Sequence, residues 1–137
     1  MQHETAVSLK GITNRFGSQV VHQNLDLEIR RGEVLGLIGG SGSGKSVLLR
    51  TIIGLQKQAE GEVSVMGINL TKGTQEDWTR ARKLWGVLFQ DGALFSSLTV
   101  AENIQVPLRL FSKLPKELMD GIAALKISLT GLPPDTG

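Results

Sequence analysis

Eight consecutive residues, 39–46, combine small side chains with one lysine in a pattern that can bind a phosphate group. Gly39, Gly44, Lys45 and Ser46 occupy the defining positions of the pattern G-x-x-x-x-G-K-S/T. Glycine allows unusual backbone angles, so several N–H groups can turn toward one anion at close range. We expect Lys45 to reach the β- and γ-phosphates of a nucleoside triphosphate and the Ser46 hydroxyl to ligate Mg²⁺. We call this segment the phosphate loop; its members are Gly39, Gly40, Ser41, Gly42, Ser43, Gly44, Lys45 and Ser46.

Apolar segments flank the phosphate loop on both sides. Residues 34–38 are typical of a strand, and residues 47–53 are typical of a helix that ends at Gly54. The first N–H groups and the positive dipole end of such a helix face the loop and favour a bound phosphate. A strand, a loop and a helix in this order are the context that a Walker A motif requires. A flexible Gly/Ser linker, the alternative, would not lie between two buried apolar elements.

Composition indicates a folded domain. The chain has 137 residues, of which 40% are hydrophobic and 20% charged, and this suits one domain with a core. No apolar run is long enough to cross a bilayer, and the polar start of the chain is no signal peptide. Cysteine is absent, which excludes disulfides and fits a reducing compartment. A scattered net charge of +2 and only 4% aromatic residues argue against a nucleic-acid partner.

Strands are predicted on both sides of the phosphate loop. Residues 6–12 and 20–29 alternate between apolar and polar side chains, and residues 60–67 with 68–70 form a further ribbon. The first two suggest an antiparallel β-layer added to a phosphate-binding core. Residues 84–89 form an unbroken apolar run, which predicts a buried parallel strand.

Helices are predicted in the second half of the chain, where capping residues precede helix formers. Thr74 caps a short helix that reaches Arg82. Thr99 and Glu102 are spaced as a capping box for a helix that Pro107 should kink or interrupt. A last helix opens around residues 114–117 and runs to about Leu129; the tail after it is a loop.

Together these segments resemble the ATP-binding subunit of an ABC transporter. The resemblance covers nearly the whole chain and rests on the strand pair ending at residues 25–29, the turn at 31–33, the phosphate loop, residues 60–63, and Val-Leu-Phe-Gln at 87–90. Residues 91–104 are similar to the family's Q-loop and the start of its helical subdomain. Residues 88–95, together with Val-Pro-Leu-Arg at 106–109, are most similar to Mla/Mce-type lipid-transport ATPases.

The resemblance implies a fold and two further site residues. The fold is an α/β P-loop NTPase core of the ABC-cassette type with an antiparallel β-layer (residues 1–96) and part of a helical subdomain (residues 97–137). Phe16 stands where the family places an aromatic ring, usually tyrosine, that stacks on adenine. Gln90 resembles the Q-loop glutamine, which contacts Mg²⁺ and the attacking water and couples the site to the permease. Lys45 and Gln90 are thus the implied catalytic residues, and Ser46 and Gln90 the implied metal ligands.

Three further family motifs have no match in this sequence: the Leu-Ser-Gly-Gly-Gln signature, a Walker B run ending in Asp-Glu, and the switch histidine. The run before Asp91 resembles a Walker B superficially, but Gln90 intervenes and the flanks match the Q-loop. We interpret His3 and His22 as surface or packing residues. We therefore expect the chain to be the N-terminal part of a cassette whose C-terminal half is absent.

The resemblance implies a function for the full-length protein. ATP and Mg²⁺ would be its cofactors, a membrane permease and a second cassette its partners, and the cytoplasmic face of the cell membrane its location. We expect the chain alone to bind nucleotide without hydrolysing it, because the glutamate after Walker B is missing.

One alternative is a non-enzymatic nucleotide-binding or interaction module. Another is a small P-loop kinase, for which neither an acceptor site nor an arginine-rich lid is visible. Uncovered strand edges also predict self-association.

Overall fold

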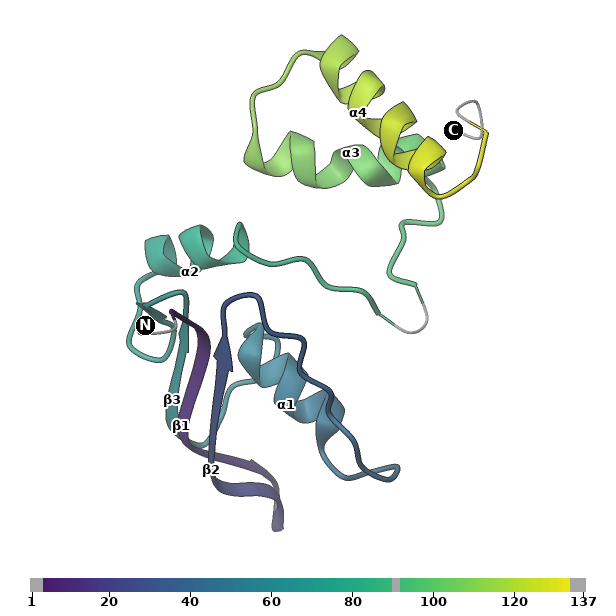
Figure 1. Ribbon diagram of the computed structural model, residues 1–137. Coiled ribbons are helices and arrows are strands. Elements are labelled where there is room, and N and C mark those ends of the chain that lie inside the picture. Colours follow the sequence, from purple (N-terminus) through teal and green to yellow (C-terminus); the bar gives the residue numbers. More distant parts are fainter. Residues whose placement is uncertain (1–3, 90–91, 134–137) are drawn as a thin grey trace. The chain divides into compact units, whose positions relative to one another are not determined.

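The computed structural model describes residues 4–89 and 92–133. The chain divides into two units, residues 1–85 and 86–137, and each is described by itself (Figure 1). The predicted domain limits of 1–96 and 97–137 remain a prediction.

An antiparallel sheet forms the first unit, with the strand order β2-β1-β3-β4. Its strands are β1 (Thr5–Phe16), β2 (Gln19–Arg30), β3 (Glu60–Val65) and β4 (Ile68–Asn69). Alternation explains the pairing, since successive side chains of a strand point to opposite faces. Leu25 and Leu27 are half-buried and lie opposite Ile12 and Leu9 of the neighbouring strand. The strands predicted over residues 6–12, 20–29 and 60–70 and the predicted β-layer are confirmed.

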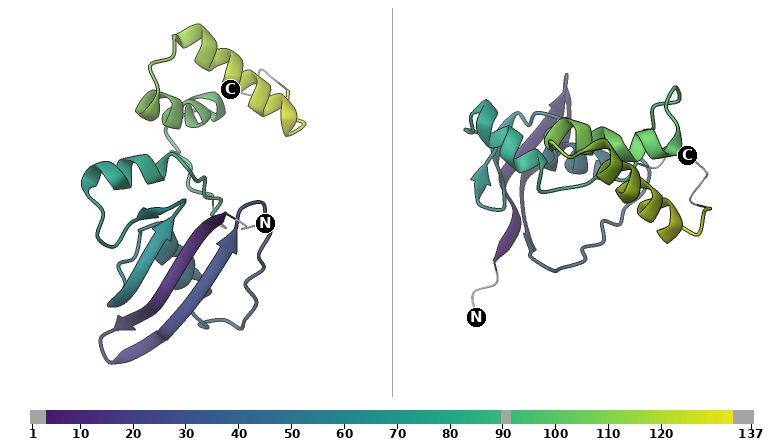
Figure 2. Two further views of the ribbon diagram at one scale, coloured as in Figure 1. Left: turned by 60° about the vertical axis from the view of Figure 1, so that its left-hand side comes forward. Right: turned by 90° about the horizontal axis from the view of Figure 1, so that it is seen from above.

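Helix α1 (Lys45–Ile52) packs against one face of this sheet (Figure 2). It buries Leu48 and Ile52, which leave 6% and 8% of their surface exposed. Burial of such side chains contributes roughly 1.5–3 kcal/mol each and thereby holds α1 against the sheet. The helix ends at the predicted place, because Gly54 adopts a φ of +74°. The core residues of the first unit are Leu9, Ile12, Leu48, Ile52, Val63, Val65, Leu70 and Ala81.

Two predicted strands do not form in this structure. Residues 34–38 and the described residues 84–89 belong to no helix or sheet, and Val34, Ile38 and Leu88 are 99%, 100% and 95% exposed. A strand buried on both faces needs hydrogen-bonded neighbours and covering layers. The only sheet in the described part of the chain is the antiparallel one, and it pairs with neither run. Apolar composition alone is therefore insufficient to make these runs strands.

Helix α2 (Gln75–Arg82) completes the first unit. Thr74 caps it as predicted: the Asp77 backbone N–H donates to Thr74 Oγ1 over 3.2 Å, and the Thr74 N–H donates to Asp77 Oδ2 over 2.9 Å. Two N–H groups that would otherwise lack a partner are thus satisfied.

The second unit contains the paired helices α3 (Val100–Phe111) and α4 (Lys116–Leu129). The Thr99–Glu102 capping box and the start of α4 after Pro115 are confirmed. Helix α3 continues through Pro107, so the predicted interruption does not occur. Proline removes one helical hydrogen bond, and the cap and the packing of α3 on α4 offset that loss. No helix in the described residues is long and apolar enough to cross a membrane.

Candidate functional site

The phosphate loop turns through glycines in the left-handed region. Gly42 has a φ of +79° and Gly44 a φ of +90°, angles that residues with a side chain rarely adopt. Gly44 is also the N-cap of α1, since its carbonyl accepts the first helical bond from the Leu48 N–H over 2.8 Å. The loop therefore feeds directly into the helix N-terminus.

Two glycines of the loop also occupy places where no side chain fits. A Cβ atom on Gly39 would lie 2.6 Å from Ser43 Oγ. A Cβ atom on Gly44 would lie 2.6 Å from His22 Nε2 and 2.7 Å from Val21 Cγ1, both on β2. A side chain at either position would therefore have to displace these atoms.

Lys45 extends across the loop. Its Nζ donates to Gly39 O over 2.5 Å, to Gly40 O over 2.7 Å and to Ser43 Oγ over 3.2 Å. An ammonium group has three donors, and all three find acceptors in the loop. The positive charge therefore lies where the pattern predicts that a phosphate binds.

The electrostatics of the loop favour an anion. The first turn of α1 contains no acidic residue, and the N-cap has no side chain that bonds to the first helical N–H groups. These groups and the helix dipole carry partial positive charge, which adds to that of Lys45. Ser46 is exposed and supplies a hydroxyl beside them. Among the described residues, no group of three or more His, Asp or Glu side chains could hold a metal ion, so a cation here would also need oxygen ligands from outside this set.

A hollow of about 370 Å³ joins the loop to the sheet. Its floor is formed by residues 41–47, and Phe16 at the end of β1 and Val21 of β2 line it as well. Phe16 is 45% exposed, so its ring is accessible. The hollow thus combines an apolar aromatic wall with a cationic, N–H-rich floor. That combination suits a molecule with a planar ring at one end and phosphates at the other.

A chain of hydrogen bonds lies between the sheet and α1. Asn14 Nδ2 donates to His22 Nδ1 over 3.1 Å and to Thr51 Oγ1 over 3.1 Å. The Thr51 hydroxyl in turn donates to Val47 O over 2.8 Å. Burial lowers the pKa of His22 below its usual value. We call Asn14, His22 and Thr51 the polar bridge.

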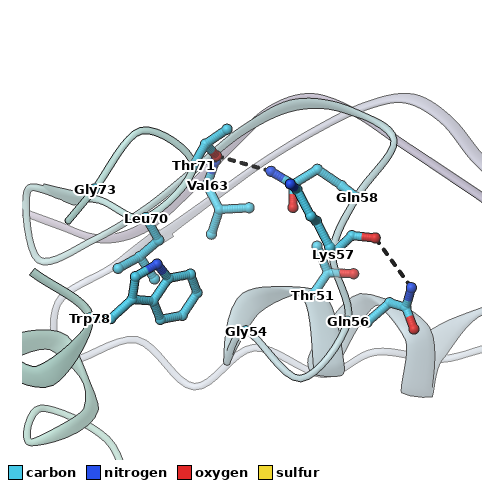
Figure 3. A pocket seen from close by; sticks show the side chains of 10 residues that line it. All are labelled: Thr51, Gly54, Gln56, Lys57, Gln58, Val63, Leu70, Thr71, Gly73 and Trp78. Carbon is cyan, nitrogen blue, oxygen red and sulfur yellow. Dashed lines mark hydrogen bonds between the residues drawn. The ribbon is translucent and has the colours of Figure 1, made fainter. Parts of the chain in front are cut away.

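A second hollow of about 290 Å³ lies at the opposite, C-terminal end of α1 (Figure 3). Trp78 of α2 forms one wall and packs so close to Gly54 that a Cβ atom there would lie 2.1 Å from Trp78 Cζ3. Gln58 Nε2 donates to Thr71 Oγ1 over 2.9 Å on the other side. The negative dipole end of α1 disfavours phosphate here. The first hollow is thus the better anion site.

The structure brings most of the predicted site residues together. Phe16, residues 41–46 of the loop and the flanking Val47 line one hollow, and Lys45 contacts the carbonyls of Gly39 and Gly40. Gln90 lies outside the described residues, so its role stays a prediction. Sequence reasoning missed Val21 and the polar bridge. The available signal was the presence of the polar residues Asn14 and His22 in or next to the predicted strands and of Thr51 on the helix after the loop.

Comparisons with known proteins show which family the chain belongs to. The family model described as "ABC transporter" matches residues 22–132. The probable ribonucleotide transport ATP-binding protein Mkl of Mycobacterium leprae is 39% identical over 127 residues, which are 93% of this chain and 37% of Mkl. The intermembrane phospholipid transport system ATP-binding protein MlaF of Haemophilus influenzae is 31% identical over 130 residues, which are 95% of this chain and 49% of MlaF. The chain thus spans less than half of either relative.

The fold prediction is confirmed by a solved structure. The ATP-binding cassette MJ0796, a dimer bound to ADP and Pi in a post-hydrolysis state, matches with a TM-score of 0.76 and 31% identity. The match covers 90% of this chain and 57% of that one. A phosphate loop at the N-terminus of α1, an aromatic residue beside it and these likenesses lead to one conclusion: the chain belongs to the ABC transporter family of ATP-binding proteins.

Proposed function

We propose that the full-length protein containing this chain is the ATP-hydrolysing subunit of an ABC transporter. The observation that carries the proposal is the hollow in which Phe16 of β1 and the phosphate loop meet. Phe16 would stack on the adenine ring, a contact worth roughly 1–3 kcal/mol for aromatic–base pairs. Lys45 and the N–H groups of the first turn of α1 would bind the phosphates, and Ser46 would ligate Mg²⁺.

The residues that line the hollow support nucleotide binding but not ATP hydrolysis. Hydrolysis needs a base or a polar group that orients water toward the γ-phosphate. None of the described residues that line the hollow is a carboxylate. We therefore propose that these 137 residues bind Mg-ATP without turnover and that residues elsewhere in the full-length protein complete the reaction. Binding without turnover by the full-length protein would instead support the non-enzymatic binding module.

The test compares two lysines by calorimetric titration with Mg-ATP. Lys45→Ala removes a charge-assisted phosphate contact and should weaken binding by about 1.5–3 kcal/mol, which is roughly 10- to 150-fold. Lys83→Ala is the matched control, because Lys83 is exposed and does not line the hollow. Equal affinities for wild type and Lys45→Ala would refute the nucleotide site.

We further propose that the transporter carries a lipid, works with a membrane permease and a second cassette, and lies on the inner face of the membrane. Support for the lipid comes from residues 88–95 and from the name of MlaF, whereas the name of Mkl specifies ribonucleotides. The rate of ATP hydrolysis by the reconstituted full-length complex distinguishes a lipid substrate from a ribonucleotide substrate. Stimulation by phospholipid vesicles, and not by nucleoside monophosphates, is the expected result; the reverse would overturn the lipid assignment.

A further inference from the structure

We infer that His22 is a positioning residue of the phosphate loop: Asn14, which also bonds to Thr51, holds the His22 ring so that it supports the N-terminus of α1. The inference rests on the proposed nucleotide site and concerns how that site is held in place. His22 does not line the hollow, so its effect on a ligand must pass through the loop.

The topology places the polar bridge between the sheet and the helix. Asn14 and His22 are direct partners in the antiparallel pairing of β1 and β2, so their side chains lie on the same face of the sheet. Asn14 is 1% exposed and reaches Thr51 of α1, which is 2% exposed. The shared face is therefore the one that packs against α1.

The polar bridge contacts α1 at two positions along the helix axis. His22 meets the helix at Gly44, where a Cβ atom would lie 2.6 Å from Nε2 and 3.0 Å from Cε1. Asn14 meets it at Thr51, seven positions farther along. Seven residues make two helical turns, or about 10 Å, so both points lie on the same side of α1. Two such contacts resist sliding along the helix axis and tilting, which a single contact would not.

The hydrogen bond between Asn14 and His22 predicts the protonation state of His22. Both N–H bonds of the Asn14 amide are used, one to His22 Nδ1 and one to Thr51 Oγ1. An amide nitrogen can only donate, so this contact predicts an unprotonated Nδ1 and a neutral His22 ring with its proton on Nε2. Asn14 Oδ1 has no hydrogen-bond partner in the part of the chain described, so the amide is held by its donor side alone.

The consequence is a phosphate site whose position depends on the buried Asn14 and Thr51 and the half-buried His22. Binding groups must be held within about 0.5 Å by the residues behind them. A loosened polar bridge would let the N-terminus of α1 and the loop move, although every residue of the hollow is still present.

The decisive experiment uses two substitutions of Thr51 with Mg-ADP as the probe, in the protein as its gene encodes it. Thr51→Val keeps the shape and removes the hydroxyl, so the dissociation constant should rise about three- to tenfold. Thr51→Ser keeps the hydroxyl and should retain wild-type affinity. His22→Ala should weaken binding by about tenfold or more, while Gln23→Ala on the exposed side of β2 should have no effect.

Nitrogen NMR of the imidazole gives a readout that packing alone would not change. Nδ1 should be unprotonated in wild type and protonated in Asn14→Asp, because a carboxylate accepts a proton that an amide donor excludes. Wild-type affinity in Thr51→Val, or a protonated Nδ1 in wild type at neutral pH, would overturn the inference. If wild type fails to bind Mg-ADP, the proposed function fails first. If only Lys45→Ala weakens binding, the nucleotide site stands and this inference falls.

Discussion

Gly44→Ala should destabilise the first unit far more than an alanine at the neighbouring left-handed glycine. Gly44 combines a φ of +90° with close neighbours, since a Cβ atom would meet His22 Nε2 at 2.6 Å and Val21 Cγ1 at 2.7 Å. Gly42 has a similar φ of +79°, but a Cβ atom there would meet nothing within 4 Å. The pair therefore separates backbone strain from steric crowding.

The magnitude follows from the two contributions. A residue with a Cβ in the left-handed region costs about 1–2 kcal/mol, and Gly42→Ala should lose only that amount. Gly44→Ala must in addition displace His22 from Asn14, which removes a partly buried hydrogen bond worth about 1 kcal/mol, and must overpack the site at a further cost of about 1–3 kcal/mol. The total is about 3–6 kcal/mol, a large fraction of the stability of a small domain.

Urea unfolding followed by tryptophan fluorescence measures this difference. Trp78 packs on Gly54 at the end of α1 and Trp85 packs against the same core, so their combined emission reports whether the first unit is folded. The cost of Gly44→Ala should fall by about 1 kcal/mol in a His22→Ala background, because one of the two clashes is relieved. Equal losses for Gly42→Ala and Gly44→Ala, within about 0.5 kcal/mol, would refute the reasoning.

Three further predictions concern other parts of the chain. Met66 and Gly67 link β3 to β4 with φ values of +47° and +78°, the signs of a type I′ turn; a Cβ atom on Gly67 would meet nothing within 4 Å, so Gly67→Ala should lower the free energy of unfolding by about 1–2 kcal/mol through backbone strain alone, and an unchanged urea midpoint would contradict this. The Lys116 ammonium and, next in size, the Gln105 amide hold the pKa of Asp120 below its usual value. The ionised Asp120 carboxylate therefore stabilises the α3–α4 pair fully at a pH above the usual aspartate pKa. This stabilisation is lost as the pH falls through the lowered pKa of Asp120. Below about pH 4 the melting temperature of wild type should thus converge on that of Asp120→Asn, and a constant gap between the two would argue against the ion pair. Exposed Val34, Ile38 and Leu88 should make these 137 residues self-associate, and light scattering that gives a monomer at high concentration would disprove it.

Local chemistry was readable from the sequence because neighbouring residues determine it. The phosphate loop depends on glycines and a lysine at fixed spacing, and the capping boxes at Thr74 and Thr99 depend on an acidic residue three positions later. The strands β1 and β2 followed from alternation, and the end of α1 followed from Gly54. The loop, the caps and the end of α1 involve contacts within a few residues of the chain, and the alternating pattern of β1 and β2 is visible in each strand by itself.

The tertiary structure alone decided what touches the loop. Residues 34–38 are apolar enough for a strand, but a strand exists only beside a partner, and the described sheet does not pair with them. The pairing of Asn14 with His22 and their reach to Thr51 depend on strand register and on where α1 docks, which no local pattern encodes. Spacing along the chain thus determined which residues can hold a phosphate. Packing between distant segments determined that Phe16 lies beside the phosphate loop and that His22 lies against Gly44. Such contacts arise only when the sheet and α1 bury their apolar faces together.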